Sequence, residues 1–316
     1  MKTIEILTQV LELLAALTAA PLFLGWVNQC RAWLQNRRAP SIWLPYRGIR
    51  KLFHKDAVIA ESASPLFRVA PYIVFGAMVV AAGIIPSMGT RLPFTIAADA
   101  IALVGLLATA RVFLSLAAMD IGTAFGTLGA RREMMVGFLA EPALLMVIFV
   151  ASMISATTAL PAITENLATQ TLALYPSLAF TAVAFILVLL AENARIPIDN
   201  PATHLELTMI HEAMVLEYSA RHLALMEWAA ALKLFNYACI GFALFIPWGV
   251  STHESGPVAL LASIPLLALK LAATGAGLAL VETISAKLRV FRAPEFLAIA
   301  FLLAVLGLLV HLLLGA

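Results

Sequence analysis

Long runs of apolar residues alternate with polar connections along the whole chain. Each run approaches or exceeds the roughly 20 residues that a helix needs to cross the hydrocarbon layer of a membrane. The runs lack the two-residue alternation of a membrane β-barrel, so they predict helices. We expect about eight membrane-spanning helices, at residues 4–28, 69–87, 94–119, 134–160, 172–190, 228–250, 257–285 and 295–314.

The composition supports the same fold class. Hydrophobic residues make up 62% of the chain, charged residues 12%, and the mean hydropathy is +0.97. A soluble fold could not cover so much apolar surface with so few charges. The first run is too long for a signal peptide, carries Glu5 and Glu12 near its start, and has its basic residues after it. We therefore expect an all-α integral membrane protein, with one polytopic domain over residues 1–316 that retains its first helix.

Lysine and arginine fall on alternate connections between the runs. The connections at about residues 29–68, 120–133, 191–227 and 286–294 hold fifteen of them, whereas the other connections hold Arg91 alone. Basic residues mark the cytoplasmic side of a membrane protein. The long connections should therefore be cytoplasmic, and both termini should face outward.

The residues that commonly hold metals are sparse and badly spaced. Cys30 and Cys239 form no CxxC motif, and His211-Glu212 lacks the second histidine of the metalloprotease helix. Of the six histidines only His311 lies in an apolar run, which leaves no bis-histidine haem site. We expect no metal, haem or iron–sulfur site formed by this chain alone. The net charge of +2 indicates no nucleic-acid partner.

The first cytoplasmic connection contains an amphipathic segment. Tyr46, Ile49 and Phe53 recur at helical spacing, and Trp33 and Trp43 flank them. The opposite side is basic and carries Arg47, Arg50, Lys51 and His54. This pattern predicts a short helix in the headgroup layer. Its role is either to bind anionic lipid and fix topology, or to brace the mouth of a buried cavity.

The connection at 191–227, with its flanking residues, is unusually acidic. Six of its eight charges are negative: the set is Glu192, Arg195, Asp199, Glu206, Glu212, Glu217, Arg221 and Glu227. Asn200-Pro201 suits a helix start. A helix continuing from there would place Glu206 and Glu217 within about 20° of each other, and His204 and His211 on a second face. A solvated acidic loop is the alternative.

Charged residues inside the apolar runs are the stronger signal. These are Arg111, Glu141, Lys233, Lys270 and Glu282. A charge at the bilayer centre costs at least about 2.5–3.5 kcal/mol, so it is usually retained for a function. Carboxylates and amines linked by water can carry protons when burial moves their pKa values toward neutrality. Alternatively the charges only fix helix packing, and Arg111 and Glu282 lie near enough to the run ends to snorkel.

Several motifs resemble one family. The run 191–201, Ala-Glu-Asn-Ala-Arg-Ile-Pro-Ile-Asp-Asn-Pro, with Glu206-Leu207 and Glu217-Tyr218-Ser219, resembles the signature of the membrane protein at the heel of respiratory complex I. Further matches lie at 37–40, 51–53, 67–71, 131–133 and 141–142. Within that superfamily, 201–214 is more similar to the membrane subunits of formate hydrogenlyase and hydrogenase-4, the component C type. Ala39 replaces a usual glycine, and Asn200 stands where hydrogenase relatives often carry an aspartate.

The resemblance implies a non-catalytic membrane subunit in the cytoplasmic (inner) membrane of a prokaryote. Its partners would be a large hydrogenase-like subunit, a small iron–sulfur subunit and antiporter-like membrane subunits. Nickel–iron and iron–sulfur centres would lie in the partners, and a quinone would be held in the complex I alternative. The implied coupling residues are Glu133, Glu141, Glu192, Arg195, Asp199, Glu206, Glu212 and Glu217, to which we add Lys233, Lys270 and Glu282. The expected docking residues are Arg37, Arg38, Arg47, Arg50, Lys51, His204 and His211.

We expect charge arriving in a docked redox arm to change the proton occupancy of nearby carboxylates and to act inward through Glu141 toward Lys233 and Lys270. The carboxylates are Glu192, Asp199, Glu206 and Glu217. Two other classes of protein remain as alternatives. A secondary transporter would show inverted repeats and broken spans, which we do not find in the sequence. A purely structural anchor would use every buried charge for packing.

Overall fold

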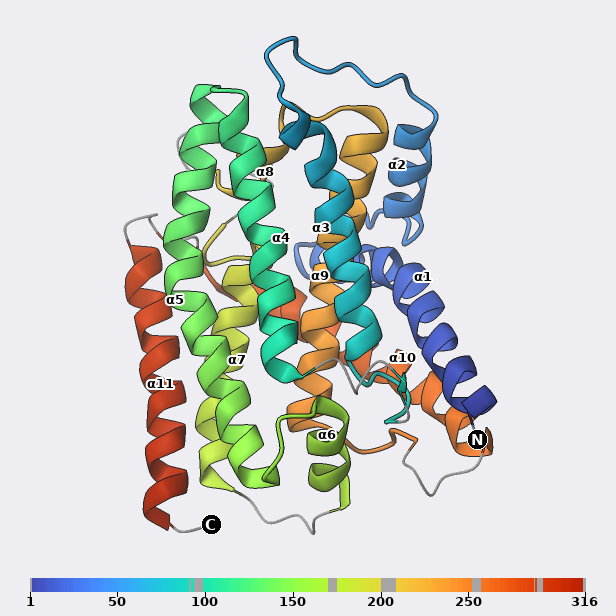
Figure 1. Ribbon diagram of the computed structural model, residues 1–316, viewed down its shortest axis with the longest axis vertical. Coiled ribbons are helices and arrows are strands. Elements are labelled where there is room, and N and C mark those ends of the chain that lie inside the picture. The colour runs from blue at the N-terminus through green and yellow to red at the C-terminus, as the bar shows by residue number, and fades with distance from the viewer. Residues whose placement is uncertain are drawn as a thin grey trace.

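Long helices account for most of the chain in the computed structural model (Figure 1). The structure describes residues 2–90, 92–93, 99–169, 175–199, 209–251, 257–286, 288 and 292–314. Within these ranges the helices are α1 (Lys2–Leu34), α2 (Leu44–Phe53), α3 (Pro65–Ile84), α4 (Ala100–Asp120), α5 (Ala124–Ser155), α6 (Leu160–Thr169), α7 (Pro176–Glu192), α8 (His211–Val215), α9 (Ala220–Phe245), α10 (Pro257–Ile284) and α11 (Ala293–Leu314). The same ranges contain no strand, only an isolated bridge between Gly89 and Ser251.

Eight helices correspond to the eight apolar runs, in chain order. Seven of those in the described ranges are long and apolar enough to cross a membrane: α1, α3, α4, α5, α9, α10 and α11. Helix α7 has 17 residues, which is the lower limit of about 17 for a span. The predicted all-α membrane fold is therefore confirmed. Helices α6 and α8 are additional and were not predicted.

Two connections between helices are shorter than expected. The loop expected at 120–133 is a short turn, because α5 already begins at Ala124, where the Thr123 hydroxyl accepts a hydrogen bond from the Gly126 amide. Helix α9 begins at Ala220, well inside the connection expected at 191–227. Helices can continue beyond the hydrocarbon layer until a cap ends them, and hydropathy does not detect that extension.

The helix expected to run on from Pro201 is not continuous. Glu206 and His204 lie outside the described residues, but Met209 and Ile210 are not helical and α8 has only five residues. Asp199 Oδ2 accepts hydrogen bonds from the amides of Ile210 and His211, which fixes a turn there. A single helix that carries both Glu206 and Glu217 on one face therefore does not form.

The predicted amphipathic helix is confirmed as α2. Ile49 is buried, whereas Arg47, Arg50 and Lys51 are exposed. The Phe53 ring meets the Trp228 ring of α9 edge-on, with 6.5 Å between centroids. Helix α2 therefore lies against the bundle by its apolar side and presents its basic side outward.

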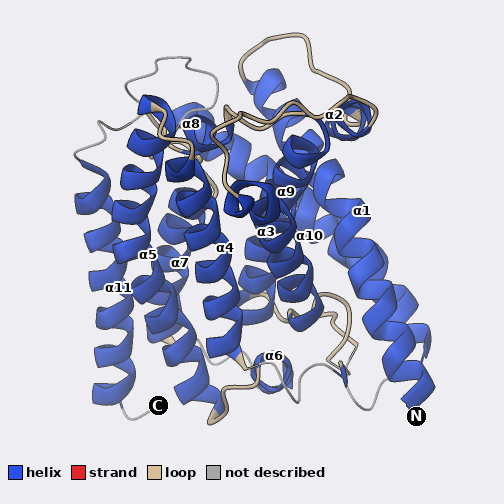
Figure 2. Cartoon of the chain, turned by 45° about the horizontal axis from the view of Figure 1, so that its top comes forward, coloured by secondary structure: helices blue, strands red, loops and turns tan. Residues whose placement is uncertain are grey.

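The chain termini lie at one end of the bundle, and the short helices α2 and α8 lie at the opposite end (Figures 1 and 2). We call the latter the α2–α8 end. Helix α9 runs through the centre, where Leu232, Leu234, Phe235 and Tyr237 are fully buried. Helix α11 packs on α5 and α7, and α10 packs mainly on α1.

Candidate functional site: a buried network of ion pairs

Arg111 of α4 is the centre of a buried cluster of charges. Its guanidinium pairs with Glu133 at 3.3 Å, and also with Glu141 and Glu192. Glu133 and Glu141 come from α5, and Glu192 is the last residue of α7. Arg111 is only 6% exposed, and Glu133 and Glu192 are each 1% exposed. Since one buried charge would be very unfavourable here, the three carboxylates are what allow Arg111 to lie inside the bundle.

Glu192 extends the cluster to the central helix. Its Oε2 lies 2.9 Å from Nζ of Lys233 on α9, while its Oε1 accepts from Arg111. One carboxylate thus joins two cations from two helices. The cluster therefore ties together α4, α5, α7 and α9 within the apolar part of the bundle.

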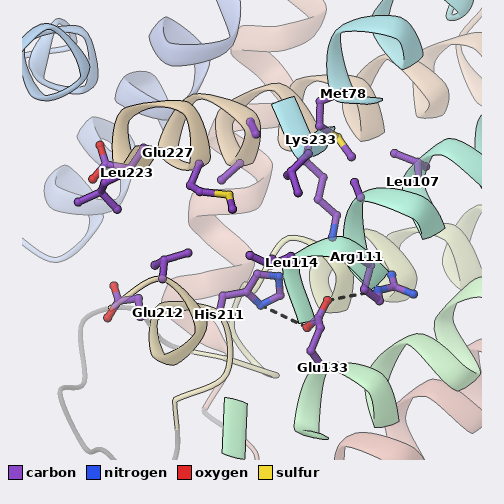
Figure 3. A pocket seen from close by; sticks show the side chains of 16 residues that line it. Met78, Leu107, Arg111, Leu114, Glu133, His211, Glu212, Leu223, Glu227 and Lys233 are labelled. Atoms are coloured by element: carbon purple, nitrogen blue, oxygen red, sulfur yellow. Dashed lines mark hydrogen bonds and ion pairs between the residues drawn. The ribbon is translucent and has the colours of Figure 1, made fainter. Parts of the chain in front are cut away.

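His211 connects this cluster to the α2–α8 end. Its Nδ1 lies 3.5 Å from Glu133 Oε2, on the far side of the carboxylate from Arg111 (Figure 3). The His211 backbone amide is held by the Asp199 carboxylate. We refer to Arg111, Glu133, Glu141, Glu192, Lys233 and His211 as the Arg111 network.

The segment that follows His211 is fixed to neighbouring elements. The Tyr218 hydroxyl donates to the Phe67 carbonyl at 3.0 Å, and the two rings stack with centroids 4.0 Å apart. Burial raises the pKa of the Tyr218 hydroxyl well above its usual range, so it remains a donor at physiological pH. The Ser219 hydroxyl donates to the carbonyl of Val58. These contacts hold α8, and with it His211, against α3 and the first connection.

The charges of the Arg111 network do not balance. Two cations, Arg111 and Lys233, face the three carboxylates of Glu133, Glu141 and Glu192. Within this set one negative charge is left over. In a low-dielectric interior an unbalanced charge interacts strongly with any charge brought close to it.

A cavity of about 190 Å³ lies beside the network. Its walls are largely apolar side chains from α3, α4 and α9, such as Met78, Leu107 and Met226. Arg111, Glu133, His211 and Lys233 lie at one side, and Glu212 and Glu227 lie farther away (Figure 3). The volume is large enough for several water molecules, and the charged groups supply polar partners for them.

A second ion cluster lies between α1, α10 and the segment after α7. Glu282 of α10 pairs with Arg195 at 3.0 Å and with Arg31 at 3.3 Å. Glu282 is 3% exposed and Arg195 is 6% exposed. We call these three residues the Glu282 cluster. Two cations share one carboxylate here. The net charge of the Glu282 cluster is therefore positive, whereas that of the Arg111 network is negative.

The described residues offer little for metal binding. Within the described ranges, no group of three or more His, Cys, Asp or Glu side chains is placed to hold a metal ion. His211 and Glu133 are instead engaged with each other and with Arg111. The charged side chains here pair with one another.

Comparison with known proteins identifies the family. The sequence pattern of the family described as NADH dehydrogenase matches residues 7–313. The chain belongs to this family. The resemblance to the heel protein of complex I and to its hydrogenase relatives is thereby confirmed.

Two relatives in the NADH dehydrogenase family come from Escherichia coli (strain K12). Hydrogenase-4 component C is 36% identical over 255 residues, covering 80% of this chain and 79% of the relative. Formate hydrogenlyase subunit 4 is 30% identical over 292 residues, covering 92% and 94%. A chain in the solved structure of the membrane-bound sulfane sulfur reductase, an archaeal respiratory membrane complex, shares the fold. Its TM-score is 0.82 at 19% identity, over 96% of this chain and 98% of that chain.

The structure brings together many of the residues that the sequence proposed for coupling. Those that form side-chain ion pairs in the two clusters are Glu133, Glu141, Glu192, Lys233, Arg195 and Glu282. Asp199 borders the Arg111 network through the backbone amide of His211. Glu212 lines the cavity away from Arg111, and Glu217 is exposed beyond α8.

Lys270 does not belong to the network, contrary to expectation. Its ammonium donates to the carbonyls of Ile246 and Trp248, just beyond the C-terminal end of α9. The flexible lysine stem reaches the carbonyl of Ile246, the C-cap residue of α9, and that of Trp248 in the turn that follows.

The docking residues separate into two kinds. Arg37 and Arg38 are exposed after α1, as are the three basic residues on α2. His211, expected on the docking surface, instead points inward to Glu133. His204 lies outside the described residues.

Two important residues were missed or misread from the sequence. Arg111 was singled out among the charges inside the apolar runs, with snorkelling as an alternative, but it was not placed in the coupling set; it is the centre of the network. Glu12 was noted only as part of the first run. It is 1% exposed, and its Oε1 accepts from the amides of Met88 and Gly89 at 2.7 and 2.8 Å. A carboxylate inside the first span was a signal for such a contact.

Gly137 of α5 provides the space for Arg111. A Cβ atom on Gly137 would lie 2.8 Å from Cδ and 3.0 Å from Cζ of Arg111. We expect Gly137→Ala to displace the guanidinium and to lower the free energy of unfolding by about 1–3 kcal/mol. Thermal unfolding of the purified protein in detergent measures this. Gly105→Ala on α4, where a Cβ meets nothing within 4 Å, is the matched control. Equal stability of the two variants would contradict the prediction.

Proposed function

We propose that this chain is the membrane anchor and coupling subunit of an energy-converting hydrogenase complex of the formate hydrogenlyase and hydrogenase-4 type, in the cytoplasmic membrane of a prokaryote. It would dock a peripheral redox arm and link electron transfer there to translocation of protons or sodium ions. Family membership and the two relatives support this proposal. The observation that carries the coupling role is the Arg111 network, which connects the interior of the bundle to the α2–α8 end through His211.

The α2–α8 end is the proposed cytoplasmic and docking face. The basic connections meet there, and both termini lie at the opposite end (Figure 2). Exposed Arg37, Arg38, Arg47, Arg50 and Lys51 would contact the large hydrogenase-like subunit and the small iron–sulfur subunit. Nickel–iron and iron–sulfur centres would belong to those partners. With this orientation both termini face outward.

The network offers a physical route for coupling. Charge arriving near Asp199 and His211 changes the electrostatic potential at Glu133. At an effective dielectric constant of about 20, unit charges about 6 Å apart interact by about 3 kcal/mol. That energy changes a proton affinity by about a hundredfold. A change of charge at His211 can therefore act on Glu133, then on Arg111 and then on Glu192, each time through the ion pair between neighbours.

In this proposal Glu141 is the residue through which the Arg111 network acts on a neighbouring membrane subunit. Its side chain pairs with Arg111 but is 34% exposed. On the same helix Phe138, Leu145 and Phe149 are 80%, 39% and 51% exposed. A carboxylate within an exposed apolar stripe is unfavourable against lipid. A neighbouring antiporter-like subunit that covers this face of α5 would remove that cost and receive the charge signal.

Substitution of Glu141 in the assembled complex tests the proposal. We expect Glu141→Gln to lower ion translocation by at least about tenfold in proteoliposomes, because it removes the charge that faces the neighbour. Redox turnover should persist, measured on the same preparation. Glu61→Gln, which alters an exposed carboxylate on the first connection and outside the network, is the control.

Two results of this experiment would oppose the proposal. Unchanged redox turnover together with unchanged ion translocation would remove Glu141 from the pathway. Neutral substitutions at Glu141 and Glu133 that prevent assembly, but never uncouple the complex that does assemble, would favour a purely structural anchor.

A further inference from the structure

The Glu282 cluster borders a pocket of its own. This pocket has a volume of about 360 Å³ and lies between α1, α9 and the segment after α7. Its polar lining is Asn28, Arg31, Asn193 and Arg195, and its apolar lining is Leu24, Ala194, Ala230 and Leu234. It is separate from the cavity beside the Arg111 network, although Ala230 contributes to both.

We propose that this pocket binds the phosphate group of an anionic phospholipid through Arg31 and Arg195. Charge is the first reason. Two guanidiniums share the single Glu282 carboxylate, so these three residues keep one positive charge in excess. Arg195 and Glu282 are almost fully buried, where uncompensated charge is costly. A phosphate diester supplies one negative charge and accepts charge-assisted hydrogen bonds from arginine. A neutral headgroup would leave the excess in place.

The shape of the pocket fits an amphiphile. Leu24 precedes Arg31 by seven residues on α1, a rise of about 10 Å along the helix. The lining therefore changes from guanidinium and amide groups to Leu24 and Leu234 over about that depth. A phospholipid changes from headgroup to acyl chain over a comparable distance. The Arg31 side chain is 22% exposed, which leaves it reachable from the pocket.

The polar lining of the pocket contains a buried hydrogen-bond acceptor that lacks a partner among the described residues. The buried Asn193 Oδ1 has no hydrogen-bond partner among the described residues, while its Nδ2 donates to the Leu189 carbonyl. Arg31 also donates a long hydrogen bond, 3.4 Å, to Asn28 Oδ1. A headgroup with a hydroxyl donor, such as glycerol, would satisfy the Asn193 oxygen beside its phosphate.

Arg31→Gln tests the proposal without leaving a buried charge unpaired. This change keeps one cation, Arg195, opposite Glu282, so the fold should persist while the excess charge disappears. The assembled complex is stripped of lipid, exposed to vesicles of phosphatidylglycerol or phosphatidylcholine, and examined by native mass spectrometry. We expect retained phosphatidylglycerol to fall about tenfold in Arg31→Gln, the loss typical of one charge-assisted hydrogen bond. Arg31→Lys should retain an intermediate amount.

The matched control is Arg68→Gln, which alters an exposed arginine in the first turn of α3, outside the pocket and outside the proposed docking residues. It should retain lipid as the unaltered complex does. Equal retention by Arg31→Gln and Arg68→Gln would overturn the proposal. A third arm adds inorganic phosphate in place of vesicles. If phosphate alone binds in an Arg31-dependent way and lipid does not, a free anion and not a phospholipid occupies the pocket, and the proposal fails.

Discussion

Replacing Arg111 with methionine is expected to prevent accumulation of the folded chain in the membrane. The change removes the cation that faces Glu133, Glu141 and Glu192, and leaves two nearly inaccessible carboxylates whose remaining partners in the network are Lys233 and His211. Removing one partner of a buried pair costs about 3–5 kcal/mol. A domain is stable by only about 5–15 kcal/mol in total, so this loss is a large fraction.

The measurement is the amount of membrane-inserted, detergent-extractable chain. The matched control is Arg131→Met, which alters an exposed arginine in the first turns of α5 and should accumulate normally. Arg111→Lys should be intermediate, because an ammonium keeps the charge but lacks the planar fork that reaches several carboxylates. Normal accumulation of Arg111→Met would show that the network contributes little to stability.

Replacing Glu282 with leucine is expected to lower the free energy of unfolding by about 3–5 kcal/mol, because it leaves the guanidiniums of Arg31 and Arg195 without their shared carboxylate. The contact between α1, α10 and the segment after α7 should loosen first. Thermal unfolding in detergent measures the overall loss, and limited proteolysis after α10 reports the local one.

The control for this variant is Glu61→Leu, on the exposed first connection, where a change within about 0.5 kcal/mol is expected. If Glu282→Leu unfolds at the same temperature as Glu61→Leu, the pairs at 3.0 and 3.3 Å contribute no net stability. A buried pair can indeed be replaced by apolar groups without loss, but only when both partners change.

The spans could be predicted from the sequence because lipid imposes the requirement on each segment separately. Every helix must satisfy its own backbone hydrogen bonds over about 20 residues. The sequence also predicted α2, because apolar residues recur on the same side of its successive helical turns. The ends of α5 and α9 could not be predicted in this way, since a cap or a left-handed residue such as Ala220, with φ of 48°, decides them.

The sequence could predict which types of residue form the site, but not which residues pair with one another. A charge inside an apolar run is visible in the sequence, and Glu141 and Lys233 were singled out on that ground. Their partners come from distant positions: Arg111 and Glu192 are 81 residues apart, and Arg31 and Glu282 are 251 apart. No spacing rule for one helix reaches so far. The sequence therefore did not show that Arg111 is the centre of a network, or that Lys270 lies apart from it.

The short turn between α4 and α5 has a consequence for biogenesis. Arg111 on α4 would enter the bilayer unpaired if its helix left the translocon alone, at a cost of about 2.5–3.5 kcal/mol. The next helix to emerge, α5, carries Glu133 and Glu141, and only residues 121–123 separate the two. We therefore expect the two helices to be released into lipid together as a hairpin whose charges are already matched.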